Sequence, residues 1–198
     1  MLSVPTSSPV KSVKELITLA RTPGSKVSYG SAGIGTATHI KGAYFSVLAG
    51  MDAVHVPYKG GGAAMTALVG GEITFLFHQA DLGVALTKAG RLRPLAYDND
   101  TRAALFPDVP TMAEAGVKPT HLDVSWHGLF APAKTPRSVI ARLDSEIHKA
   151  FAQPEMRERF VKNGVIPIGD SSAEFSKFFK ASIGKFREAT RAAGIKPE

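Results

Sequence analysis

Short apolar segments alternate with longer segments of helical spacing between residues 26 and 97. The apolar segments have the length of strands and lie at 27–29, 53–56, 73–77 and 93–97. The segments between them have apolar residues at helical spacing and lie at about 36–48, 63–69 and 82–88. Connections that contain a helix favour parallel strands and right-handed crossovers. The pattern therefore predicts an α/β fold with a parallel sheet flanked by helices.

Residues 1–10 precede this unit and show no regular pattern. Their prolines and serines predict an irregular leading segment, which has neither the charged start nor the apolar centre of a secretory signal. Ser12 and Glu15 have the spacing of a capping box, in which each side chain bonds to the backbone of the other residue. A helix is therefore expected from about residue 12, and a proline–glycine pair should end it.

The pattern changes after residue 97. Residues 98–110 are polar and rich in proline, which is typical of a surface connection, and Thr111 to Glu114 is another capping box. An extended segment at 124–131 holds the single tryptophan. Helices are expected at about 136–152, 154–162 and 171–193, with one strand at 165–168. The last third of the chain is therefore predicted to be mostly helical.

The composition is that of an ordinary folded protein. Of the 198 residues, 44% are hydrophobic, and no apolar run approaches the roughly 18 residues of a membrane-spanning helix. Cysteine is absent, so disulfide scaffolds, thiol nucleophiles and cysteine-ligated metal centres are excluded. Much of the net charge of +7 comes from Lys and Arg interleaved with Glu in the last third. No basic run alternates with aromatic residues, so the charge does not indicate nucleic-acid binding.

The segment 29–39 links a predicted strand to a predicted helix and is rich in glycine and hydroxyl groups. Its glycines permit unusual backbone angles, so the N–H groups from Ser31 to Thr36 can point into one concavity at the positive end of the helix. A carboxylate there accepts charge-assisted hydrogen bonds, each worth about 1.5–3 kcal/mol. A tight turn whose glycines only relieve steric crowding has the same local pattern. The segment is therefore a candidate anion site, with the plain turn as the alternative.

Two further loops follow strands at the same predicted edge of the sheet. Residues 56–62 contain Lys59 and three consecutive glycines, and His78 and Gln79 follow the strand at 73–77. Open α/β sheets bind ligands beyond the carboxyl ends of their strands. Three loops that converge on one edge support a binding site more strongly than one loop does. The backbone of the second loop is a better candidate than Lys59, because a lysine at this place is more simply explained as a surface residue on a flexible turn.

The residues give little support for catalysis. Ser31 stands in Gly-Ser-Ala-Gly rather than in the Gly-x-Ser-x-Gly of a nucleophile elbow. The glycine spacing differs from G-x-G-x-x-G, and no Gly-Lys-Ser/Thr follows. The six histidines show no His-Glu-x-x-His motif and no close pairing, so neither a metal site nor a cofactor is expected. An enzyme acting on an anionic substrate is the rival hypothesis, and it requires an acid/base pair near Ser31.

Five sequence motifs occur in order along the chain. They are YGSAGIGT at 29–36, VHVPYKG at 54–60, GGEI at 70–73, FPDVPTMAEAG at 106–116 and WHGLFAP at 126–132. With these motifs the chain resembles the tripartite tricarboxylate transporter receptors, also called Bug-type extracytoplasmic solute receptors, from about residue 11 to residue 195. Several motifs in a fixed order are far more specific than a single glycine loop.

This resemblance implies a periplasmic, type II-like binding protein with two lobes and no catalytic activity. Such a receptor holds a small carboxylate between its lobes and delivers it to membrane transporter subunits. The ligand-binding residues implied for this chain are Ser31, Ala32, Gly33, Gly35, Thr36, His78 and Gln79. Family members often have an Asp-Asn pair where this chain has His78 and Gln79, so the ligands of this chain need not be the familiar ones.

Family members also carry a long additional segment, with a signal peptide and part of the first lobe, before the region that this chain resembles. The chain therefore corresponds to one complete α/β lobe at residues 10–123 and to a carboxyl-terminal, mostly helical share of the other lobe at 124–198. Apolar helix faces of an incomplete lobe need a partner, so self-association into a homo-oligomer is expected. A remnant that only self-associates and binds no ligand is a further alternative.

Overall fold

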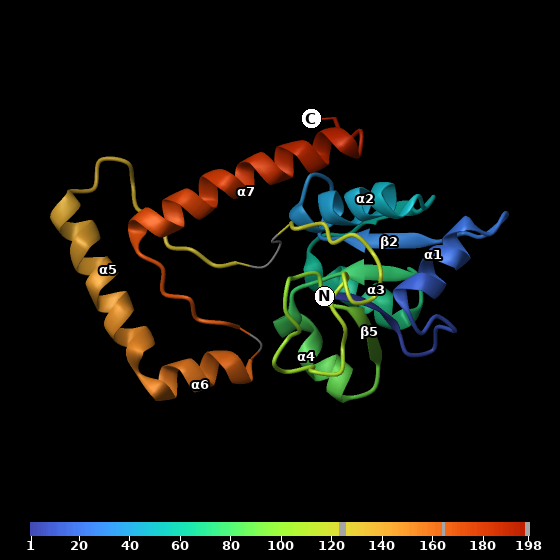
Figure 1. Cartoon of the computed structure of the whole chain (residues 1–198), viewed down its shortest axis with the longest axis horizontal. Coiled ribbons are helices and arrows are strands. Elements are labelled where there is room, and N and C mark those ends of the chain that lie inside the picture. Colours follow the sequence, from blue (N-terminus) through green and yellow to red (C-terminus); the bar gives the residue numbers. More distant parts are fainter. Residues whose placement is uncertain (123–125, 164, 197–198) are drawn as a thin grey trace.

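The computed structural model describes residues 1–122, 126–163 and 165–196. A sheet covered by helices forms one part of the molecule, and three helices extend from it (Figure 1). We call residues 1–122 the sheet unit and residues 126–196 the helical arm.

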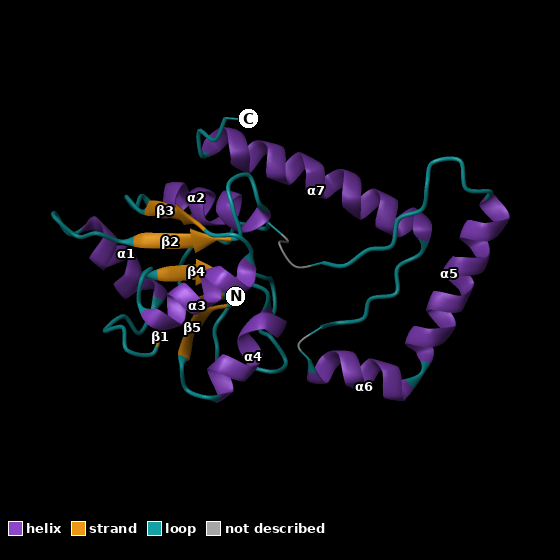
Figure 2. Ribbon diagram, turned by 180° about the vertical axis from the view of Figure 1, so that it is seen from behind, coloured by secondary structure: helices purple, strands orange, loops and turns teal. Residues whose placement is uncertain are grey.

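The sheet has five strands in the order β3-β2-β4-β1-β5. The strands are β1 (Leu2–Pro5), β2 (Ser28–Ser31), β3 (Val54–Pro57), β4 (Phe75–Phe77) and β5 (Leu92–Ala96). Strand β2 pairs in parallel with β3 and β4, which confirms the predicted parallel pairing of these three strands. They therefore end at the same edge, as their arrowheads in Figure 2 show. We call this edge the carboxyl edge.

The prediction of an irregular segment at residues 1–10 is wrong for Leu2–Pro5. These residues form the buried strand β1, which runs antiparallel to β4 on one side and to β5 on the other. Four residues are too few to show an alternating pattern, and proline, which a strand tolerates at its end, disguises the segment as a loop. The sheet is therefore mixed rather than wholly parallel, and the sheet unit includes residues 1–10.

Four helices cover the sheet. They are α1 (Val13–Arg21), α2 (Ala37–Ala49), α3 (Gly61–Gly70) and α4 (Ala80–Lys88). Ser12 accepts a hydrogen bond from the Glu15 amide and so caps α1, as predicted. Gly50 and Gly71 end α2 and α3 in the left-handed conformation, which glycine adopts without steric penalty. The glycines of the sequence pattern thus set the lengths of these helices.

Strand β4 separates two hydrophobic cores. Phe75 and Phe77 point to the first core, where Phe45 of α2 packs edge-on against both rings. Leu76 points to the second core, together with Leu68 of α3. Full burial of such side chains contributes about 1.5–3 kcal/mol each to folding. The sheet is thereby held between helices on both faces, which fixes the positions of the loops at its edge.

A buried ion pair fixes the end of the sheet unit. Lys41 of α2 lies 2.8 Å from Asp98, and their side chains are 3% and 1% exposed. The Lys41 ammonium also donates to the carbonyl oxygen of Leu122 at 2.8 Å. The amide of Thr120 donates to Asp98 Oδ1 at 3.0 Å, and its hydroxyl donates to Oδ2. The chain is therefore attached to α2 just before it leaves for the helical arm.

The helical arm contains α5 (Arg137–Ala152), α6 (Pro154–Lys162) and α7 (Ser172–Ala192). No residue of α5 or α6 is buried, whereas α7 packs along α2 and buries Ser182 and Ala189. The predicted strand at 165–168 is wrong, because these residues are irregular and pair with none of the strands in the part of the chain that the structure describes. The predicted extended segment at 124–131 lies partly outside the described residues, and its residues from 126 onward are irregular.

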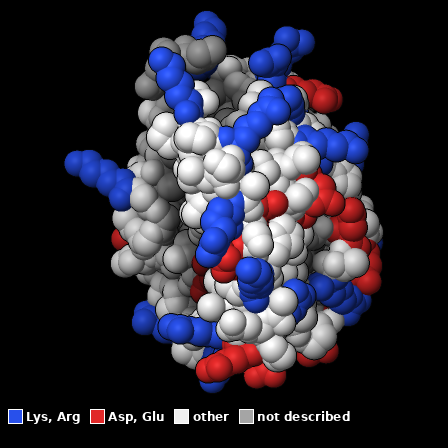
Figure 3. Space-filling view, turned by 90° about the vertical axis from the view of Figure 1, so that its left-hand side faces the viewer, with Lys and Arg blue, Asp and Glu red and all other residues white. Residues whose placement is uncertain are grey.

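The surface of the helical arm carries both signs of charge. Figure 3 shows basic and acidic side chains interspersed around an uncharged area on this side of the molecule. The arrangement agrees with the interleaving of Lys, Arg and Glu in the sequence. Among the helices of the described residues, none is both long and apolar enough to cross a membrane.

Candidate functional site

Two loops meet at the carboxyl edge. We call residues 31–36, after β2, the first loop and residues 58–60, after β3, the second loop. The amides of Tyr58 and Gly60 donate to carbonyl oxygens of the first loop at 3.0 and 3.1 Å. Gly33 and Gly60 have φ angles of 136° and 108°, which residues with a Cβ rarely adopt. These glycines allow the loops to approach each other, as the sequence predicts.

The amides of the first loop donate to acceptors within the same segment. These acceptors are Thr38 Oγ1 for Ala32 (3.0 Å), Ser31 Oγ for Gly33 (3.1 Å) and His39 Nδ1 for Gly35 (3.1 Å). All three are neutral side-chain atoms. Hydrogen bonds to an ionised carboxylate are roughly twice as strong as those between neutral groups. The predicted donors are therefore present, and the hydroxyl acceptors of the Ala32 and Gly33 amides are ones that a carboxylate can outcompete.

Three helices begin at the carboxyl edge without a side-chain cap. The residues preceding α2, α3 and α4 are Thr36, Gly60 and Gln79, and none caps its helix through its side chain. Instead, the Thr36 hydroxyl donates to the Gly33 carbonyl oxygen at 2.6 Å. Uncapped first-turn amides carry the positive end of the helix dipole. The edge is therefore electropositive, although the charged residue of the second loop, Lys59, is merely exposed.

A stack of rings lies beneath the first loop. His39 of α2 and His55 of β3 have parallel rings with centroids 3.8 Å apart, and His55 stacks on Tyr29 of β2 at 5.0 Å. The spacing of the histidines along the chain does not reveal this pair, which forms only in the folded sheet. The signal lies in the strand register, because Tyr29 pairs with His55 only once β2 and β3 are aligned.

The ring stack is uncharged at neutral pH. Burial, followed by the neighbouring His39, lowers the pKa of His55 to about 4. Burial also lowers the pKa of His39, and it raises the pKa of Tyr29 to about 12. Because the stack carries no charge of its own, an anion at this edge must be held by amides, hydroxyls and helix dipoles.

Ser31 and His55 have the proximity of a catalytic dyad but not its other features. Ser31 Oγ lies 2.7 Å from His55 Nε2, yet Ser31 is fully buried and its Oγ also contacts the carbonyl oxygen of Gly33 at 3.0 Å. None of the ion pairs among the described residues joins a carboxylate to His55. A nucleophile needs access to substrate and a base oriented by a third group. The geometry gives the enzyme hypothesis no support.

His78, at the third strand end, is part of the core rather than of an open edge. It is 3% exposed, and its ring packs against Gly83 of α4. Nδ1 lies 2.7 Å from the Gln79 carbonyl oxygen, so it carries the hydrogen, and Nε2 accepts from the Ser3 hydroxyl of β1 at 2.8 Å. The unpredicted strand β1 thus supplies the partner of His78. We leave the His78 ring out of the proposed site, while Gln79 stays a predicted ligand contact.

Burial of His78 should make stability depend on pH. Burial, followed by the nearby α-amino group of Met1, lowers the pKa of His78 to about 3, whereas an unfolded histidine titrates near 6.5. The unfolded chain therefore binds the proton first, and stability falls as the pH drops from about 6.5 towards 3. His78→Asn keeps a donor to Gln79 without titrating. We expect wild type to lose on the order of 2–3 kcal/mol more than this variant between pH 7 and 4, in urea titrations of unfolding.

The control for this measurement is His148→Asn, since His148 lies on α5 with its side chain 46% exposed. This variant should follow the wild-type pH profile. Parallel profiles for wild type and His78→Asn would show that the folded protein protonates His78 as readily as the unfolded chain does.

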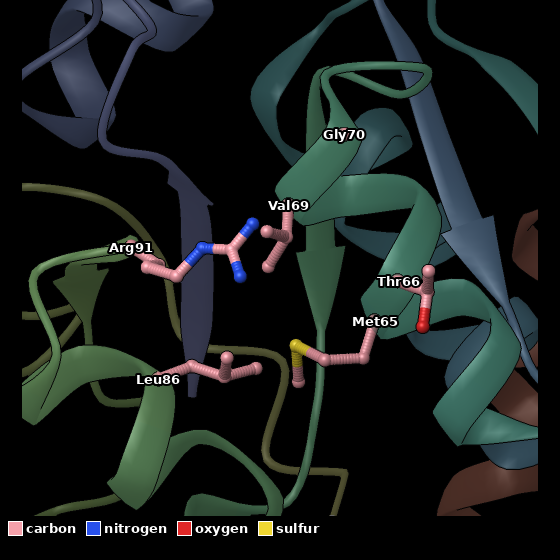
Figure 4. A pocket seen from close by; sticks show the side chains of 6 residues that line it. All are labelled: Met65, Thr66, Val69, Gly70, Leu86 and Arg91. Atoms are coloured by element: carbon pink, nitrogen blue, oxygen red, sulfur yellow. The ribbon is translucent and has the colours of Figure 1, made fainter.

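One hollow lies away from the loops, where α3 ends and β5 begins. Its volume is about 280 Å³, and Met65, Val69, Leu86 and Arg91 point toward one another across it (Figure 4). It is mostly apolar and open, and it lies at the opposite edge of the sheet from the first loop. Among the described residues, no group of three or more His, Asp or Glu is placed to hold a metal ion.

Comparison with known proteins supplies the context for these loops. The family model described as "Tripartite tricarboxylate transporter family receptor" matches residues 1–195. A UPF0065 protein from the tcbD-tcbE intergenic region of Pseudomonas sp. (strain P51) is 33% identical over 188 residues, which are 95% of this chain and 56% of that protein. The chain spans about half the length of the curated relatives it matches.

Two solved structures match over nearly the whole chain. Rpa4515 of R. palustris, solved with adipate, is 27% identical with a TM-score of 0.88, and the match covers 100% of this chain and 66% of that one. A structure described as a periplasmic transporter is 34% identical with a TM-score of 0.86, and the match covers 98% and 65% of the two chains. Both matches include the helical arm, and the matched proteins are solute-binding receptors rather than enzymes. The chain therefore belongs to the tripartite tricarboxylate transporter receptor family, as its motifs predict.

Proposed function

We propose that this chain is the ligand-binding part of a solute receptor, and that it captures a small carboxylate at the carboxyl edge of the sheet unit. The observation that carries this proposal is the pair of joined glycine loops in front of the uncapped helices α2 and α3. The likeness to a receptor solved with adipate supports a carboxylate as the ligand.

Binding takes place by exchange of hydrogen-bond acceptors in the first loop. The carboxylate displaces the hydroxyl acceptors of the Ala32 and Gly33 amides, while the Gly35 amide keeps its hydrogen bond to His39. The charge of the carboxylate gains about 0.3–1 kcal/mol more from each helix terminus. The ligand contacts are Ser31, Ala32 and Gly35 through the backbone, Gly33 through its amide, Thr36 through its hydroxyl, and Gln79 from the neighbouring strand end. The Ser31 side chain itself faces the ring stack and so orients the loop.

Titration of the purified chain with adipate tests this proposal. We expect weak, saturable binding with chemical-shift changes confined to the two loops and the start of α2. Hexanoate, with one carboxylate, should bind in the same place, and hexanol should not. Binding of neither acid would favour the alternative that the chain only self-associates, and shifts confined to the hollow of Met65 and Arg91 would move the site there.

We further propose that the chain acts in the periplasm and delivers its carboxylate to membrane transporter subunits. The matched family is defined by such receptors, and one of the solved relatives is described as a periplasmic binding protein. Co-purification of the loaded receptor with the membrane subunits of its own transporter tests this partnership. A chain that associates equally well with adipate and without it would argue against delivery of ligand.

The helical arm exposes large apolar side chains that a partner would shield from water. Helices α5 and α6 stand apart from the sheet unit in Figures 1 and 2. The large apolar side chains exposed there and in the adjoining segments are Leu129, Phe130, Val139, Leu143, Val161, Ile166 and Ile168. The match covers only 66% and 65% of the chains of the two solved relatives, which therefore carry further residues outside the match. In the purified chain, we propose, a second copy covers this surface.

Sedimentation velocity measures this self-association directly. Wild type is expected to form a dimer or larger species, because burial of the apolar surface stabilises the contact by about 25 cal/mol per Å² before the cost of association. Leu129→Glu, at a side chain 79% exposed, should shift the chain towards monomer. Val54→Glu is the matched control, since Val54 is 63% exposed but lies on β3. A strict monomer that binds no apolar dye would rule the contact out.

A further inference from the structure

His39 connects the first loop to the sheet. Its Nδ1 accepts the hydrogen bond of the Gly35 amide, and its ring stacks on His55 of β3. The residue is 8% exposed, so the contact is sheltered from solvent. It belongs to the first turn of α2, directly behind the loop that the proposed function places around the carboxylate. One side chain thus links the loop backbone, the helix start and the edge strand.

The bond from Gly35 determines the protonation state of His39. An amide N–H can only donate, so Nδ1 must present its lone pair and the ring is neutral, with its hydrogen on Nε2. Protonation of Nδ1 would bring two N–H groups to face each other where 3.1 Å now separates the nitrogens. The hydrogen bond would be lost, and Gly35, at φ 73°, would lose the contact that holds it.

His55 does not have this constraint. Its Nε2 contacts the Ser31 hydroxyl, which can accept a hydrogen bond as well as donate one. Protonation of His55 would therefore leave that contact intact, with the Ser31 hydrogen directed to the Gly33 carbonyl oxygen. His39 is the histidine of the stack whose protonation breaks a bond to the loop.

We propose that His39 is a positioning residue of the carboxylate site, and that the first loop keeps its binding form only while the His39 ring is neutral. Acidification then releases the carboxylate, because it breaks the link between the ring and the Gly35 amide. This inference rests on the proposed function.

The groups packed around His39 favour the neutral ring. Its titratable neighbours are His55 on β3 and Tyr29 on β2, and β4 presents only apolar side chains. Helix α7 packs on α2, and its charged side chains, Glu174, Lys177, Lys180, Lys185, Arg187, Glu188 and Arg191, are all exposed. On α2 itself, Lys41 is paired with Asp98. Burial lowers the pKa of His39, and no carboxylate offsets this effect.

Two variants distinguish the effect of the His39–Gly35 hydrogen bond from the effect of protonating His39. His39→Asn keeps an acceptor near the position of Nδ1 but cannot be protonated, so it should bind adipate at pH 7.5 about as well as wild type. His39→Phe keeps a ring for the stack but has no acceptor, and its affinity at pH 7.5 should be about tenfold lower, the value of one net hydrogen bond. His148→Asn on the exposed face of α5 is the matched control.

The decisive measurement is the affinity for adipate between pH 7.5 and 4.5. Adipate itself takes up protons in this range, so the affinity of wild type is divided by that of His39→Asn at each pH. This ratio should stay near one at high pH and fall by up to about tenfold per pH unit below the pKa of His39. A constant ratio, or one that rises in acid because the imidazolium attracts the carboxylate, would overturn the inference and leave the proposed function in place.

A second measurement needs no ligand. The chemical shift and hydrogen exchange of the Gly35 amide should change with pH in wild type, with the same midpoint as the His39 ring nitrogens, and should stay constant in His39→Asn. If adipate fails to bind but this titration is observed, the proposed function fails while the control of the first loop by His39 stands. If Gly35 does not respond to the protonation of His39, the positioning role is refuted whatever adipate does.

Discussion

Asp98→Ala is expected to lower the free energy of unfolding by about 3–5 kcal/mol, the usual cost of removing one partner of a buried ion pair. The substitution leaves the Lys41 ammonium, 3% exposed, with only the Leu122 carbonyl oxygen as its acceptor. It also removes both acceptors of Thr120. Urea titration monitored by circular dichroism measures the loss.

Asp100→Ala is the matched control for this prediction. Asp100 lies two residues along the chain, its side chain is 83% exposed, and it approaches His121 only at 3.8 Å. Its replacement should change stability by less than about 0.5 kcal/mol. The double variant Lys41→Met with Asp98→Leu should recover most of the loss, since no charge is then buried. A cost below about 1 kcal/mol for Asp98→Ala would mean that solvent reaches Lys41.

Gly33→Val is expected to abolish detectable binding of adipate. Gly33 has a φ of 136°, so a β-branched residue forces the first loop to change its backbone. The valine methyl groups would also extend past the Cβ position, which already lies 3.5 Å from the Tyr58 carbonyl oxygen, and would separate the two loops. Calorimetry with adipate measures the loss, and unchanged affinity would place the ligand elsewhere.

Gly24→Val is the control that separates backbone strain from loss of the site. Gly24 has a φ of 81° and lies after α1 in the sheet unit, and a Cβ added to it would meet no other atom within 4 Å. Both variants should lose about 1–2 kcal/mol of stability because of the left-handed backbone. Only Gly33→Val should lose adipate binding. Thermal-shift measurements compare the stabilities of the two variants, and calorimetry compares their affinities for adipate.

The parts of the fold that could be predicted are those with local signals. Ser12, Thr111 and Ser171 each accept a hydrogen bond from the amide three residues later, as their capping boxes predict. Strand β1 could not be found in this way, because its partners β4 and β5 lie more than seventy residues away along the chain. The prediction of a strand at 165–168 is wrong for the converse reason, since its apolar run has a local signal but no sheet to join among the described residues.

In the candidate site, too, some parts have a local sequence signal and others depend on pairing between distant segments. The glycines of the first loop carry their own conformational signal, and the loop forms where the sequence places it. The ring stack needed the register of β2 on β3, which brings Tyr29 and His55 together. The place of His78 depended on β1, because Ser3 is its hydrogen-bond partner. Local sequence therefore predicts the backbone donors of the site, and the tertiary pairing decides which side chains face them.

The single tryptophan gives this protein an intrinsic fluorescence signal from one known position. Trp126 packs edge-on against Phe175, Phe178 and Phe179 in the first part of α7, a joint within the helical arm between the segment that starts at residue 126 and this helix. With no second indole to dilute the signal, its emission spectrum records the hydration of that one joint. Changes in the packing within the arm can therefore be followed in real time, without labelling, in the unmodified chain.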